Sequence, residues 1–112
     1  MESTRQKKVS RLIQKELADI FIKRGSEISH GNLVSITKVR ISPDLSFAKV
    51  YISIFPAKNQ DDLLKSIQDQ TSKLRFDLGQ KTRSQLRIVP DIAFMIDDSL
   101  DYIENIDRLL KS

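Results

Sequence analysis

Residues 37–55 alternate between apolar and polar side chains, and this alternation constrains the fold more than any other feature of the sequence. The alternation runs to Ile41 in the first half, and in the second half every other residue of Ala48–Ile54 is apolar. A period of two is typical of a strand that buries one face. Between the two halves, Pro43 and Asp44 favour a tight turn. We therefore predict a β-hairpin around which the other elements are arranged.

The first strand of this hairpin is expected to begin at Leu33. Its apolar residues change phase between Ile36 and Val39. A β-bulge near Thr37 and Lys38 would reconcile the two phases, because one extra residue in a strand shifts the faces of those that follow.

The first helix is predicted to begin at Ser3, whose spacing from Gln6 fits a capping box. Apolar residues then recur three or four apart down to about Arg24, and Gly25 can end the helix. Residues 25–32 are predicted to form a loop. Its single histidine, His30, is interpreted as an ordinary loop residue, because the chain has no second histidine and no cysteine to complete a zinc site.

A long helix should follow the hairpin, with Asn59 as its cap. Its apolar stripe fades after Gly79, so we expect a kink or break between Gln70 and Lys81, with Ser72 and Gly79 as the candidate positions.

The rest of the chain is predicted to add one strand and one helix. The strand spans 92–96, and the last helix begins near Asp98 and carries an acidic polar face. The closest pair of carboxylates, Asp97 and Asp98, is explained by the capping of this helix.

The predicted order is helix, strand, strand, broken helix, strand, helix, which forms an α+β layer with helices on one face of a three-stranded mixed sheet. A right-handed crossover through the broken helix is expected to place the third strand parallel to the first. The same order occurs in type II KH domains, which bind RNA, although the GxxG loop of that fold is absent here.

Size and composition indicate a single domain, residues 1–112, with one core. The absence of cysteine excludes disulfides and thiolate chemistry. The longest apolar run is too short to cross a bilayer and no secretory core is evident, so a cytoplasmic location is expected. We find no phosphate loop, nucleophile or acid–base constellation, and therefore predict a protein that is not an enzyme and needs no cofactor or metal.

The basic residues are unevenly distributed along the chain. Residues 1–90 carry 17 Lys and Arg against 9 Asp and Glu, a net charge of +8, whereas residues 91–112 carry 2 against 6, a net charge of −4. Such segregation is typical of nucleic-acid binders, because neutralised phosphates release counterions. A merely solvated basic surface would account for the charge equally well.

Three segments of the chain are similar to the ribosome-binding factor A family, bacterial small-subunit assembly factors with a type II KH fold. They are TRQKKVSRLIQKEL at Thr4–Leu17, ITKVRISPDLSFAKVYIS at Ile36–Ser53 and LRIVPDIAFMIDDSLDYIENIDRLL at Leu86–Leu110. The resemblance implies a kink between two helices in place of the GxxG loop. It also implies binding to the immature small ribosomal subunit, contacts with its ribosomal RNA, late maturation and processing of that RNA, and a role in growth in the cold.

The expected phosphate contacts are basic residues from three parts of the chain. They are Arg5, Lys8, Arg11 and Lys15 in the first helix, Arg40 and Lys49 in the hairpin, and Lys73, Arg75, Lys81, Arg83 and Arg87 in and after the broken helix. We expect them to converge on one positive surface, apart from the acidic last helix. Changing Lys81, Arg83 and Arg87 to glutamate is expected to weaken subunit binding with little effect on the melting temperature.

Two further interpretations concern the partners. Tyr51 could stack on bases, whereas Phe47 is better explained as covering the sheet. The alternative function is a basic protein-interaction module that docks on an acidic partner; the basic face of its first helix lacks the large apolar residues that membrane insertion needs. In either case the protein is expected to be a monomer without a small-molecule substrate.

Overall fold

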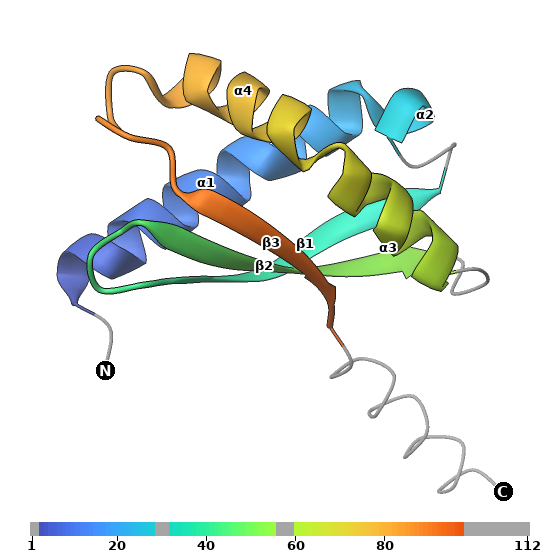
Figure 1. Cartoon of the computed structure of the whole chain (residues 1–112), viewed down its shortest axis with the longest axis horizontal. Coiled ribbons are helices and arrows are strands. Elements are labelled where there is room, and N and C mark those ends of the chain that lie inside the picture. The colour runs from blue at the N-terminus through green and yellow to red at the C-terminus, as the bar shows by residue number, and fades with distance from the viewer. Residues whose placement is uncertain (1–2, 29–31, 56–59, 98–112) are drawn as a thin grey trace, which may run out of the picture.

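The computed structural model describes residues 3–28, 32–55 and 60–97, which form a three-stranded sheet with helices on one face (Figure 1). The predicted last helix lies outside the described residues, as do His30, Asn59 and Asp98. The elements in chain order are α1 (Thr4–Lys23), α2 (Gly25–Ile28), β1 (Leu33–Ile41), β2 (Phe47–Phe55), α3 (Gln60–Asp69), α4 (Thr71–Thr82) and β3 (Asp91–Ile96).

The start of α1 confirms the predicted capping box. The Ser3 hydroxyl accepts a hydrogen bond from the Gln6 amide at 3.1 Å, and the Gln6 side chain accepts one from the Ser3 amide at 2.8 Å. The predicted loop after this helix is wrong in its first residues, where α2 forms a single helical turn. Ile28 is fully buried, and its amide bonds the carbonyl of Arg24 at 3.0 Å, so core packing favours the turn.

The hairpin and its bulge are confirmed. β1 and β2 pair antiparallel, and their register shifts between Ile36 and Lys38. The bulged residue, Thr37, places its hydroxyl 3.2 Å from the carbonyl oxygen of Tyr51 and 2.5 Å from Oδ2 of Asp97. The bulge therefore links β1 to the end of β3 across the central strand.

The predicted neighbour of the third strand is wrong. The sheet order is β1-β2-β3, and β3 pairs parallel with β2. Helices α3 and α4 return the chain to the end of the sheet where β2 begins, so β3 must run in the direction of β2 and opposite to β1 (Figure 1). The free edge of β2 is the position that such a crossover reaches.

The long helix breaks at Gln70, the first residue of the predicted interval, so neither Ser72 nor Gly79 is the break. At this point the Thr71 hydroxyl donates to the Gln68 carbonyl at 2.7 Å, and such side-chain bonds compete with the helix backbone. Gly79 lies within α4, where an added Cβ would come within 3.1 Å of Cγ2 of Val89. Glycine is thus used there for close packing.

The core lies between the helices and one face of the sheet. Buried residues of the three strands are Ile36, Val39 and Ile41 in β1, Ala48, Val50, Ile52 and Ile54 in β2, and Ile92 and Phe94 in β3. From α1, Phe21 packs edge-on against Phe94, with ring centroids 6.1 Å apart. Within the described ranges, no helix has the length and apolarity needed to cross a membrane.

Candidate nucleic-acid interface

The predicted cations of the first helix form a row on the outward face of α1, which we call the helix group. It consists of Lys8, Arg11 and Lys15. These residues are spaced three and four apart and are all exposed, opposite the buried side of α1. Like charges at this spacing repel each other on a helix, so an anionic partner would stabilise the row.

A second group, the sheet group, lies on the face of the sheet that α1, α3 and α4 leave open. Arg40 and Lys49 are direct cross-strand partners, and Lys38 is paired with Tyr51 in the next row. Like charges directly opposite each other destabilise a sheet. Phe47, on the same face, is 39% exposed, whereas Tyr51 is half-buried.

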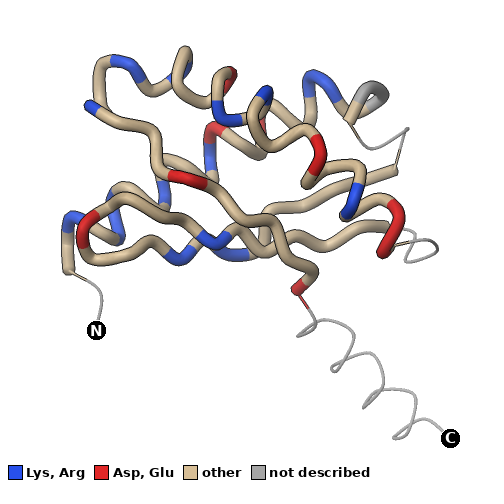
Figure 2. Tube along the Cα trace, viewed as in Figure 1, with Lys and Arg blue, Asp and Glu red and all other residues tan. Residues whose placement is uncertain are grey.

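The helix and sheet groups do not share one surface. α1 packs on β1 from the side on which Val39 and Ile41 are buried, whereas Arg40 alternates with them and faces the other way. The expectation of a single convergent positive surface is therefore wrong for these two groups. Figure 2 shows basic positions spread over both the helices and the hairpin.

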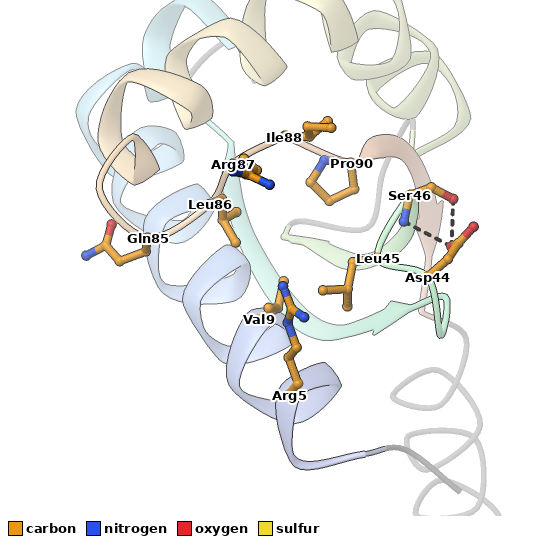
Figure 3. Close-up of a pocket in the computed structure, with 10 residues that line it drawn as sticks. All are labelled: Arg5, Val9, Asp44, Leu45, Ser46, Gln85, Leu86, Arg87, Ile88 and Pro90. Atoms are coloured by element: carbon orange, nitrogen blue, oxygen red, sulfur yellow. Dashed lines mark hydrogen bonds between the residues drawn. The ribbon is translucent and has the colours of Figure 1, made fainter.

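A third group, the end group, comprises Arg5, Arg83 and Arg87. Arg5 comes from the first turn of α1 and Arg87 from the segment before β3, and both line one cavity of about 290 Å³ (Figure 3). Arg83 directly follows α4 and is exposed. The fold thus brings together residues 82 positions apart in the sequence, as was expected for the cations in general.

Two predicted phosphate contacts are instead engaged inside the protein, and Arg75 is the first. Its Nε donates to the carbonyl oxygen of Pro90 at 2.9 Å and its Nη2 to that of Val89 at 2.8 Å. Its Nη1 lies 3.5 Å from Oδ1 of Asp91. Arg75 therefore fixes the segment that leads from α4 into β3.

Lys81 is the second engaged cation. Its Nζ contacts Oδ2 of Asp19 directly and lies 3.7 Å from Oε2 of Glu16, both in α1. The hydrogen bond that Lys81 donates to Asp19 raises the pKa of Lys81 and lowers the pKa of Asp19. Lys81 thus ties α4 to α1, so the expectation that its change to glutamate spares the melting temperature does not fit the structure.

The remaining predicted cation, Lys73, is exposed on α4, and other residues of this helix, among them Phe76 and Gly79, line a hollow of about 440 Å³. Phe76 is 66% exposed.

Across the part of the chain that is described, no cluster of three His, Cys, Asp or Glu side chains could hold a metal ion.

Sequence reasoning missed the apolar residues that line the cavity beside the arginines of the end group. Leu45 and Ile88 line the same cavity as Arg5 and Arg87, and Ile88 is 75% exposed. The sequence did offer one signal for Ile88, because this apolar residue, between Arg87 and Val89, belongs to no predicted helix. Leu45 gave no such signal, since its positive φ of 62° follows from the turn geometry.

Solved structures share this fold. The crystal structure of ribosome-binding factor A from Thermus thermophilus matches with a TM-score of 0.68 at 20% identity, over 81% of this chain and 94% of that one. A homology model of the Thermus thermophilus factor, fitted into a cryo-EM map of a 30S complex, matches with a TM-score of 0.64 at 20% identity, over 80% and 91% of the two chains.

Sequence relatives are more similar. Ribosome-binding factor A of Cytophaga hutchinsonii is 50% identical over 111 residues, which are 98% of this chain and 83% of the relative. That of Christiangramia forsetii is 46% identical over 98% of this chain and 85% of its own length. The family model for ribosome-binding factor A matches residues 5–110. The chain therefore belongs to the ribosome-binding factor A family.

Proposed function

We propose that this protein is a non-enzymatic assembly factor that binds the immature small ribosomal subunit and its ribosomal RNA. It assists late maturation and processing of that RNA, including in the cold. Family membership supports the proposal, as does the similar Thermus thermophilus factor, whose coordinates were fitted into a 30S complex. The proposal includes a monomer in the cytoplasm.

One observation carries the RNA part of the proposal, namely that nine of the predicted cations are exposed and lack partners within the described residues. The proposed contacts are Arg5, Lys8, Arg11, Lys15, Arg40, Lys49, Lys73, Arg83 and Arg87. Cations without a partner in the protein are available to neutralise phosphates and release their counterions. Arg75 and Lys81 support this surface from inside, by holding α4 and the segment after it.

The distribution of these cations fits a site inside a ribonucleoprotein particle. The helix group and the sheet group lie on opposite sides of the sheet, so a single straight RNA helix cannot contact both. RNA segments that approach from two sides could do so. An acidic protein partner would need to surround the domain in the same way, which fits the rival function less well.

Sedimentation with purified small subunits tests the proposal. Arg87→Glu should lower the bound fraction severalfold, whereas the matched charge change Lys65→Glu, on α3 and outside the three groups, should have little effect. Binding should also weaken steeply with salt, because each phosphate contact releases counterions. Equal binding of both variants, together with a flat salt response, would contradict an electrostatic RNA interface.

A further inference from the structure

The cavity at the end group has walls from three separate parts of the chain (Figure 3). α1 contributes Arg5 and Val9, and the hairpin turn contributes Asp44, Leu45 and Ser46. The segment between α4 and β3 contributes Gln85, Leu86, Arg87, Ile88 and Pro90. The cavity therefore exists only in the folded domain.

The lining combines apolar side chains with two guanidinium groups. Val9 is buried and Leu45 and Leu86 are half-buried, so they offer a hydrophobic surface. Arg5 and Arg87 are exposed and have no hydrogen bond or ion pair within the described residues. An occupant should therefore have an apolar, compact body and negative charge beside it.

The walls are held in place before any ligand arrives. In the turn, Oδ1 of Asp44 accepts bonds from the hydroxyls of Ser42 and Ser46, both at 2.7 Å, and the amide of Asp91 bonds the carbonyl of Ser46 at 2.9 Å. On the opposite side, the Leu86 amide bonds the carbonyl of Thr82 at 2.8 Å. Such preorganisation reduces the entropy that binding must overcome.

We propose that this cavity receives one unstacked base of single-stranded RNA, with the adjoining phosphates bound by Arg5 and Arg87. The inference rests on the proposed function and names the RNA element that this end of the protein takes. Unpaired bases are bound elsewhere by stacking on arginine planes and apolar surfaces. A cavity of about 290 Å³ lies at the lower limit of small-ligand sites and suits one ring system.

The charge of Asp44 favours a base over an acidic peptide. Hydrogen bonds from Ser42 and Ser46 lower the pKa of Asp44 to about 2, so this rim of the cavity is negative at neutral pH. A carboxylate inserted beside it would be repelled, whereas a neutral base is not. The phosphates of the RNA are bound by Arg5 and Arg87.

Fluorescence anisotropy with a labelled adenosine hexamer tests the inference, with a hexamer of abasic nucleotides as the comparison. Wild-type protein should bind the intact hexamer about tenfold more tightly, because the base buries apolar surface in the cavity and an abasic nucleotide does not. Leu45→Gly should remove this preference, because it deletes one apolar wall while glycine accepts the positive φ. Chemical-shift changes at the methyl groups of Leu86 and Ile88 on addition of AMP would locate the base.

The arginines are tested by the double variant Arg5→Ala with Arg87→Ala. Its affinity for the hexamer should fall about tenfold, and the slope of log affinity against log salt should decrease by about 1.4 for two phosphates on a single strand. The double variant Lys7→Ala with Lys65→Ala removes the same charge from exposed residues that belong to none of the three groups and do not line the cavity, and it should retain the base preference.

The outcomes separate the inference from the proposed function. If RNA binds but abasic and intact hexamers bind equally, the base pocket is refuted while RNA binding stands. Competition by an acidic peptide that contains tryptophan, without competition by AMP, would also overturn it in favour of a protein ligand. If neither small subunits nor RNA bind, the proposed function itself fails.

Discussion

Changing Arg75 to methionine should destabilise the protein through the carbonyl groups that the arginine holds. Pro90 is fully buried, so loss of its bond to Nε leaves a carbonyl oxygen without water, at a cost of about 1–3 kcal/mol. Val89 is partly exposed and its carbonyl can be hydrated, so that bond contributes about 1 kcal/mol or less. The ion pair with Asp91 adds little, because Asp91 is 75% exposed.

The expected decrease in the free energy of unfolding is therefore about 1–4 kcal/mol. Urea unfolding followed by circular dichroism measures it, and the midpoint should fall by about 1–2 M for a domain of this size. Methionine keeps the aliphatic stem, so packing is largely retained. Arg75→Lys should recover only part of the loss, since one ammonium cannot reproduce the fork that reaches both carbonyls.

Arg83→Met is the matched control, because Arg83 is exposed and without a partner among the described residues. It should unfold at nearly the wild-type urea concentration but bind small subunits less well. If Arg75→Met also unfolds within about 0.3 kcal/mol of wild type, the two carbonyl bonds contribute nothing net. Arg75 would then return to the set of candidate RNA contacts.

Three further predictions concern ties near the ends of the helices and in the hairpin turn. Lys81→Glu should lower the melting temperature clearly, because it places a third carboxylate beside two of α1, whereas Arg83→Glu should not; equal melting would contradict the proposed tie. Ser3→Ala should cost about 1 kcal/mol by removing the helix cap, a decrease of about 4 °C in thermal unfolding. Since the folded pKa of Asp44 is about 2 against an ordinary 3.8, its contribution to stability is present above pH 4 and lost as the pH falls toward 2, so Asp44→Asn should differ from wild type at pH 7 and converge with it in acid.

The elements predicted correctly from the sequence depend on short-range patterns. The capping box joins residues three apart, and the hairpin follows from alternation on either side of a turn. The bulge at Thr37 was predictable because one extra residue in a strand is what changes the phase of its apolar positions. In each case the local preference and the buried face agree.

The errors concern features that tertiary contacts decide. The break at Gln70 occurs where the chain passes from packing against β3 to packing against α1. Gly79 seemed the weaker helix position by propensity, yet its missing side chain is what allows close contact with Val89. The position of β3 required following the direction of the chain through the crossover, which strand patterns alone do not give.

The candidate site was predictable in composition but not in arrangement. Sequence alone identifies exposed cations, yet it cannot separate those that meet acids or carbonyls after folding. The partner of Lys81 is 62 residues away, and the carbonyls held by Arg75 are 14 and 15 residues away. The cavity at the end group combines apolar and basic residues from three segments, none of which carries a motif by itself.

The edges of the sheet bear on how this protein recognises a partner. A strand edge with free carbonyls can accept an added strand from another chain, which is a common mode of peptide binding. Here helix glutamines donate to carbonyls of both edge strands, at 3.1 Å in each case. The pairs are Gln6 with Ile41 and Gln14 with Ile36 on β1, and Gln68 with Phe94 on β3. Strand addition at these positions would have to displace the glutamine amides. Recognition is left to exposed side chains, among which basic residues outnumber acidic ones in the described ranges, and this favours phosphate over a peptide strand as the bound group.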